Sequence, residues 1–175
     1  MRNIPLYSVW IAAGLAISVP AFSPVQAETP AVPGKVAVSP RLKEFEKLLH
    51  ETAAELVKVM EPDAGGMIQP GKAVAIIKKC CQADTSALSV ELAAAYLSFT
   101  DHLAKVGAVL AELPEELKVT PEGMKALAEK DPAAAEKVKG LPARLESLDE
   151  EGLILSWKLE KAAAASGINL LPFLD

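Results

Sequence analysis

The chain has 175 residues, of which 51% are hydrophobic and 5% aromatic, and its formal net charge is −5. That length suits one globular domain rather than two, and the hydrophobic content excludes a wholly disordered chain. The negative charge argues against a general nucleic-acid binder, because such proteins use Lys and Arg to replace the counterions of phosphate. We therefore expect one folded domain that binds no nucleic acid.

The N-terminus has the pattern of a secretory signal peptide. Arg2 supplies a positive charge, residues 6–19 form an uncharged and mostly apolar stretch, and the sequence VQA places small residues before a cleavage point after Ala27. The apolar stretch is shorter than the about 20 residues that a membrane-spanning helix needs. We predict that residues 1–27 are removed, which leaves a periplasmic or secreted protein with no membrane span. The alternative is an uncleaved membrane anchor.

The rest of the chain is more acidic and rich in alanine. Loss of residues 1–27 removes one basic side chain, so 17 basic residues stand against 23 acidic ones and the net charge becomes −6. Three runs of consecutive alanines favour helices, since alanine has the highest helix propensity. Residues 28–38 contain two prolines and a glycine, and we expect a flexible leader there. Residues 39–175 are expected to form a single helical domain.

Apolar residues recur at helical spacing in three long segments. Segment 40–61 starts after Ser39 with Pro40, the pattern of an N-cap followed by proline at the first helical position. Segment 86–113 has the longest stripe and would extend about 42 Å as a helix, so we expect it to be the central helix of a bundle. Segment 144–165 has residues that we expect to face the core: Leu145, Leu148, Leu153, Trp157 and Ala164.

Shorter helices are expected between these segments. Residues 72–82 are assigned to a helix rather than a strand, because the chain offers no second strand to pair with it. Prolines and the sequence Gly140-Leu141-Pro142 predict short helices with tight corners before residue 144, and Gly152 is a point where the last helix can split. The predicted fold class is therefore all-α, a bundle of four to six helices with one long central helix.

The two cysteines, Cys80 and Cys81, are adjacent. Neighbouring side chains on a helix point about 100° apart, so one should face the core and the other the surface. Three interpretations stay open: small apolar residues without a chemical role, oxidation as a strained pair or between chains, and a functional thiol or soft-metal ligand beside Lys78 and Lys79. His102 is the histidine placed to join such a site, although a position on the flank of its helix also explains it.

The C-terminal segment is apolar. Gly167 is expected to cap the last helix, and the residues after it are expected either to fold back over the end of the bundle or to bind a partner. The candidate partner-binding residues are Ile168, Leu170, Leu171 and Phe173.

Known catalytic motifs are missing from the sequence. Residues 66–73 fit the phosphate-binding pattern G-x-x-x-x-G-K, but Ala73 stands where a Ser or Thr should hold magnesium, so we interpret them as a turn between helices. The chain lacks the G-x-S-x-G, C-x-x-C and H-E-x-x-H patterns, and catalysis by carboxylates alone is the weakest option. We predict an exported, non-catalytic interaction or structural module of the cell envelope that uses no cofactor and binds an envelope protein or itself. The alternative is a small-ligand or metal-binding helical bundle.

Overall fold

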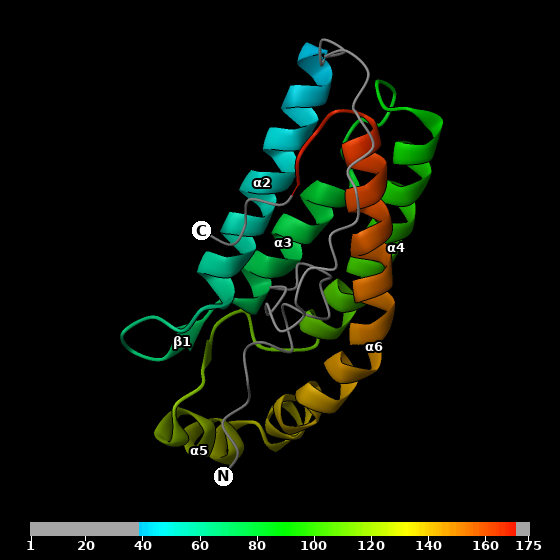
Figure 1. Ribbon diagram of the computed structural model, residues 1–175. Coiled ribbons are helices and arrows are strands. Elements are labelled where there is room, and N and C mark those ends of the chain that lie inside the picture. Colours follow the sequence, from blue (N-terminus) through cyan, green and yellow to red (C-terminus); the bar gives the residue numbers. More distant parts are fainter. Residues whose placement is uncertain (1–38, 171–175) are drawn as a thin grey trace, which may run out of the picture.

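The structure is a computed structural model that describes residues 39–170 (Figure 1). The predicted signal peptide (1–27) and leader (28–38) lie outside the described residues. The described part contains five helices and a pair of two-residue strands: α2 (Pro40–Met60), β1 (Met67–Ile68), α3 (Pro70–Cys81), α4 (Val90–Leu110), β2 (Leu117–Lys118), α5 (Pro121–Lys130) and α6 (Pro132–Ala165). The all-α prediction is therefore confirmed.

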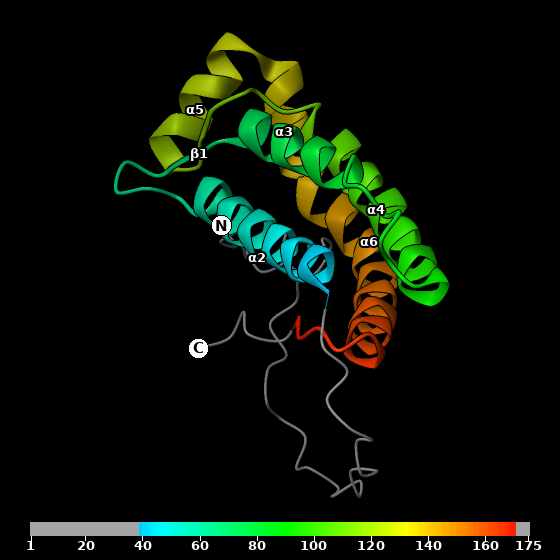
Figure 2. The ribbon, with the colours of Figure 1, turned by 90° about the horizontal axis from the view of Figure 1, so that it is seen from above.

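The helices pack in a simple order (Figure 2). α2 lies against α3, α3 against α4, and α4 against α6, while α5 packs on the first part of α6. α4 is thus enclosed between α3 and α6, which explains why nearly half of its residues are buried. The largest fully buried side chains of the core include Met60, Leu92, Tyr96, Leu103, Val106, Leu110, Val138 and Leu145.

The central helix was predicted in the right place but with the wrong length. α4 starts at Val90 because Ser89 is its N-cap, with the Ser89 hydroxyl accepting a hydrogen bond from the Leu92 amide at 3.2 Å. The residues just before Ser89 form a turn rather than part of the helix, and in this turn the Asp84 carboxylate accepts a hydrogen bond from the Ser86 amide at 2.8 Å. The longest helix is α6, which has 34 residues.

α6 starts twelve residues before the predicted boundary and contains both predicted break points. Asp131 caps its first turn, and neither Pro142 nor Gly152 ends it. Proline removes one intrahelical hydrogen bond and bends a helix, and Figure 1 shows that α6 bends in its first half. Val138 and Leu145, on either side of Pro142, are both buried, so packing stabilises the helix across the proline.

The predicted inner face of α6 was partly wrong. The buried stripe runs through Leu145, Gly152 and Leu159, whereas Leu153 is 43% exposed and Trp157 is 60% exposed. Ala164 is exposed as well. Because Gly152 has no side chain, the spacing of apolar side chains does not indicate the buried stripe, and it favours Leu153 and Trp157 instead.

The β1–β2 pair is a feature that the sequence did not predict. Met67 pairs with Lys118 and Ile68 with Leu117 in antiparallel register, which joins the loop after α2 to the segment before α5. Gly66 has a φ of 75° at the start of this ladder, and a Cβ there would collide with Thr120. Each strand has only two residues, which is too few for an alternating apolar and polar pattern to be visible in the sequence.

Candidate functional site

The two cysteines lie at the end of α3 and face α4. Cys80 is buried, and the Tyr96 hydroxyl lies 3.3 Å from its sulfur and donates a hydrogen bond to its carbonyl oxygen at 2.5 Å. The Tyr96 ring meets the ring of Phe45 edge-on, with centroids 4.9 Å apart. These contacts link α3 to α4 and place Tyr96 against α2, so Cys80 and Tyr96 have a structural role in the core.

The chemistry of both thiols is that of neutral groups. Burial raises the pKa of the Cys80 thiol, and hydrogen bonds with Tyr96 and Thr52 offset that effect only in part. Cys81 is half-buried and donates to the Thr100 carbonyl at 3.4 Å, and burial is also the main cause that raises its pKa. Both are free thiols. Their raised pKa values oppose the interpretation in which neighbouring lysines stabilise a thiolate.

His102 lies on the other side of α4, against α6. Its ring is buried, which corrects the predicted position on the helix flank, and its Nδ1 is 3.5 Å from the Glu151 carboxylate. The Lys105 ammonium contacts both oxygens of that carboxylate at 2.8 and 2.9 Å. The hydrogen bond from Lys105, and to a smaller extent His102, lowers the pKa of Glu151. The cluster joins α4 to α6 by charge.

These residues do not form one site. Cys80 and Cys81 face the α3–α4 interface, while His102 faces the α4–α6 interface. Within residues 39–170, no group of three or more His, Cys, Asp or Glu side chains is arranged to hold a metal ion. The geometry therefore offers no support for the combined thiol and imidazole site that the sequence suggested.

The end of α6 has the predicted glycine cap. Gly167 has a φ of 81°, its amide donates to the Ala164 carbonyl, and the next amide, that of Ile168, donates to the Ala163 carbonyl, each at 3.0 Å. This pattern of two hydrogen bonds is the Schellman motif. It turns the chain sharply away from the helix axis.

The residues after the cap cross to α2 (Figure 2). The Asn169 amide donates to Glu46 at 3.0 Å, and the Asn169 carbonyl lies 3.1 Å from His50 Nε2. Ile168 and Leu170 are buried in the core, so the bundle itself covers these two candidate partner-binding residues. Leu171 and Phe173, the other two, lie outside the described residues.

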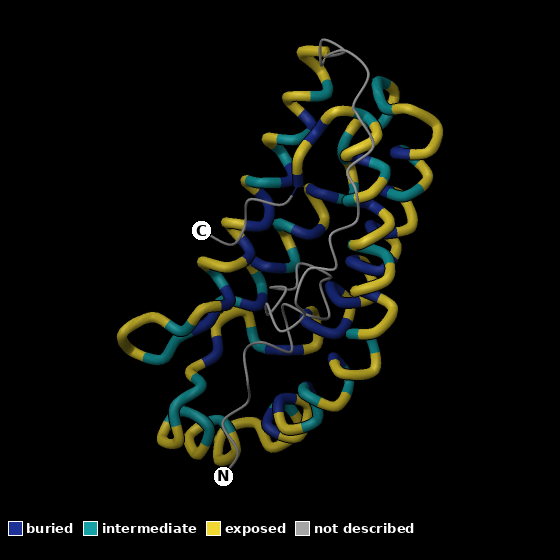
Figure 3. The backbone as a smooth tube through the Cα atoms, viewed as in Figure 1, coloured by how far each residue is buried: buried dark blue, intermediate teal, exposed yellow. Residues whose placement is uncertain are grey.

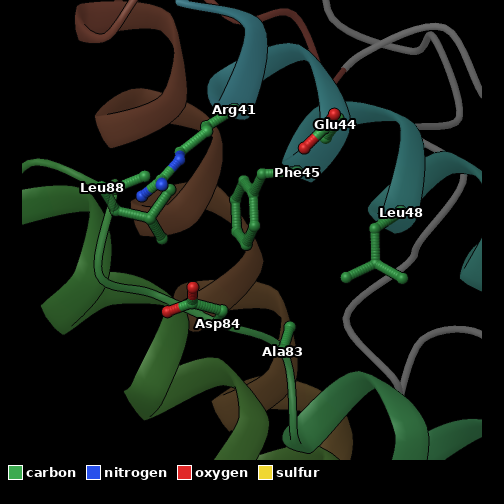
Figure 4. Close-up of a pocket in the computed structure, with 8 residues that line it drawn as sticks. Arg41, Glu44, Phe45, Leu48, Ala83, Asp84 and Leu88 are labelled. Atoms are coloured by element: carbon green, nitrogen blue, oxygen red, sulfur yellow. The ribbon is translucent and has the colours of Figure 1, made fainter.

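A pocket of about 360 Å³ lies between the first half of α2 and the connection from α3 to α4. Figure 4 shows Arg41 and Phe45 pointing from α2 toward Leu88 and Asp84. Hydrogen bonds from Ser86 lower the pKa of Asp84, and the charge of Arg41 contributes less. The pocket thus offers one basic side chain, Arg41, and two acidic ones, Asp84 and Glu44, beside an aromatic ring. The sequence gives no sign of this pocket, because its two walls are about 40 residues apart in the chain.

α6 presents an apolar surface to solvent, which we call the α6 face and define as Leu153, Ile154 and Trp157. Ile154 is 47% exposed, a value between those of Leu153 and Trp157. The Lys161 ammonium lies 5.5 Å from the centre of the Trp157 ring, a cation–π contact. This surface was not predicted, because Leu153 and Trp157 were expected to lie in the core. Figure 3 shows the alternation of exposed and buried turns along α6.

The turn that resembles a phosphate-binding loop is already occupied by the chain. The Gly71 amide donates to the Glu115 carbonyl at 3.1 Å, and a Cβ on Gly71 would lie 3.2 Å from the Glu115 backbone. An amide that donates to the protein backbone is not available to a phosphate oxygen. The interpretation of this segment as a structural turn agrees with that packing.

Across the described part of the chain, no helix combines the length and the apolar character needed to cross a bilayer. Comparisons with protein-family models, with curated protein sequences and with solved structures each find no match to this chain. The function proposed below therefore rests on the residues and geometry of this chain alone.

Proposed function

We propose that this protein is an exported, non-catalytic interaction module of the cell envelope and that the α6 face binds its partner. The observation that carries the proposal is the exposure of Trp157 beside two other large apolar side chains. Full burial of a large apolar side chain contributes about 1.5–3 kcal/mol relative to full exposure. These three side chains are 43–60% exposed, so about half of that free energy remains to be gained at each. The fold leaves this free energy unrealised at the α6 face, and a partner realises it on binding.

Two general properties of interfaces support this choice of surface. Tryptophan is enriched among the residues that contribute most to binding, and clustered apolar residues mark interaction sites, unlike single ones. Among residues 39–170, the other large exposed apolar residues are divided between α2 and α4: Val57, Val90 and Leu97. The export part of the proposal rests on the signal-peptide pattern, and the intact mass of the protein from its own cells tests it. A mature chain starting at Glu28 is expected.

The interaction is tested with two matched aspartate variants. Trp157→Asp places a charge on the α6 face, and Val90→Asp places the same charge at a residue that is 87% exposed at the start of α4. Envelope extracts are separated by size under native conditions and the chain is detected. We expect wild type and Val90→Asp to migrate in a complex that Trp157→Asp fails to form. A wild-type chain that migrates alone, or a complex that both variants retain, would refute the proposal.

Small-ligand binding is a second candidate function, and the pocket at Arg41 and Asp84 favours it. Its volume lies near the lower end of the range for ligand sites, about 300–1,000 Å³. Its one basic and two acidic side chains suit a small zwitterion with an apolar part, because Arg41 can bind an anionic group and Asp84 and Glu44 a cationic one. Native mass spectrometry of the protein from its own cells tests this. A bound mass that Arg41→Ala removes would support ligand binding, and a bare polypeptide would argue against it.

A further inference from the structure

We infer that the partner of the α6 face is a second copy of this chain, bound with the two α6 helices antiparallel. This inference rests on the interaction function proposed above and names its partner. It depends on the order of charges along the exposed side of α6, which runs from Glu150 through Ile154 and Trp157 to Lys161.

The exposed stripe of α6 has a symmetric pattern. Glu150, Ile154, Trp157 and Lys161 are separated by four, three and four residues, so they lie on one side of the helix, and all four are exposed. The sequence of properties is acidic, apolar, apolar and basic. A two-fold axis between Ile154 and Trp157 therefore exchanges an apolar residue for an apolar one and an acid for a base.

Antiparallel pairing about this axis satisfies every position of the stripe. Ile154 meets Trp157 of the second copy, and Glu150 meets Lys161 of the second copy, and the symmetry produces each pair twice. A parallel pairing would place Glu150 against Glu150 and Lys161 against Lys161, and like charges at facing positions oppose association. The charge pattern thus favours one orientation over the other.

The residues around this stripe agree with close approach of two helices. Ser147 and Ala164 continue the spacing at the two ends, and both are small and exposed. Leu153 lies at the edge of the seam, one residue from Ile154 and one helical turn from Trp157. From Ser147 to Ala164 the seam is about 26 Å long.

The expected dimer is weak. One pair of helices in contact over about 26 Å buries less than the 1,200–2,000 Å² of a standard interface, so we expect a dissociation constant on the order of 10 µM. The ion pairs are exposed and add little affinity, but they set the orientation. Exchange of their charges is therefore the sharpest test.

The test uses sedimentation equilibrium on the protein as isolated, over concentrations from about 1 to 200 µM around the expected dissociation constant. Glu150→Lys and Lys161→Glu each turn two attractive contacts into two repulsive ones, and each should weaken the dimer at least about tenfold. The double variant restores both pairs and should return to within about fivefold of wild type. A mixture of the two single variants should form a heterodimer tighter than either homodimer, because the mixed pair matches all four charges whereas each homodimer of a single variant opposes like charges.

Circular dichroism serves as the control for folding, since both positions are exposed on the helix. A wild-type chain that is monomeric up to the highest concentration, or single variants whose loss neither the double variant nor the mixture reverses, would overturn the inference. A monomeric wild type whose Trp157-dependent complex persists in envelope extracts would overturn the dimer and leave the proposed function standing. Binding of the monomer to anionic vesicles through Trp157 would likewise replace the second copy as the partner.

Discussion

The orientation of α6 predicts very unequal losses of stability for two alanine substitutions two residues apart. Leu159 is 4% exposed, whereas Trp157 is 60% exposed. We expect Leu159→Ala to destabilise the protein strongly and Trp157→Ala to have little effect, although tryptophan is much the larger side chain. The assignment made from the sequence alone, with Trp157 in the core, predicts a large effect at Trp157.

The magnitudes follow from burial. Leu159→Ala removes three buried carbons, worth about 0.8 kcal/mol each, and leaves a cavity, so the free energy of unfolding should fall by about 3 kcal/mol. Trp157→Ala removes a mostly solvated ring and one exposed cation–π contact with Lys161, so the loss should stay below about 1 kcal/mol. The two effects differ by about 2 kcal/mol, which exceeds the usual error of such measurements.

The assay is guanidinium unfolding followed by circular dichroism, with the protein below about 1 µM, where a weak dimer contributes nothing to stability. Val90→Ala, at an exposed position on α4, is the control for substitutions without a packing effect. A Trp157→Ala variant that loses more stability than Leu159→Ala would refute the described orientation of α6, and with it the α6 face.

Four further predictions concern the helix cap, the buried hydroxyl, the alkaline pH dependence and the thiols. Gly167→Ala should lower the free energy of unfolding by about 1 kcal/mol, because only glycine adopts its positive φ without strain. Gly140→Ala should raise the free energy of unfolding by up to about 1 kcal/mol, because Gly140 lies inside α6 with open space around it. The midpoints of guanidinium unfolding of the two variants test both expectations. Tyr96→Phe should cost about 1 kcal/mol, because it removes a buried donor from the Cys80 carbonyl, and an unchanged midpoint would show that this hydrogen bond contributes nothing. Burial raises the pKa of both Cys80 and Tyr96, so at alkaline pH the native state holds these protons longer than the unfolded state does. The stability that these two groups contribute should be constant below the ordinary thiol pKa of 9.0 and should fall above it. Unfolding midpoints at about pH 8 and pH 10 check the sign, and a rise would contradict it. Iodoacetamide should modify Cys81 before Cys80 and both more slowly than a free thiol, and peptide mass mapping over time would detect the reverse order.

Helix ends that depend on a capping residue close in sequence were predicted correctly. The serine and proline at residues 39–40 start α2 as expected, with the Ser39 hydroxyl accepting from the Leu42 amide at 3.2 Å. Gly167 ends α6 as expected. In both cases the signal and the hydrogen bond that it produces lie within a few residues of each other.

Features that depend on contacts between distant segments were not visible in the sequence. The continuation of α6 through Pro142 depends on the burial of residues on both sides of the proline, and the position of its buried stripe depends on Gly152, which has no side chain to detect. The deeper burial of one of the two adjacent cysteines, Cys80 rather than Cys81, agrees with the difference that helical geometry alone predicts. Their distance from His102, the pocket at Arg41 and the α6 face all required the packing of one helix on another.

The most direct test of the central claim is photo-crosslinking in living cells from a diazirine amino acid that replaces Trp157. The same residue in place of Glu129, exposed on α5, is the control. We predict an adduct from position 157 alone, with the mass of two copies of this chain. Equal adducts from both positions, or none from position 157, would contradict the claim that the α6 face is an interaction surface.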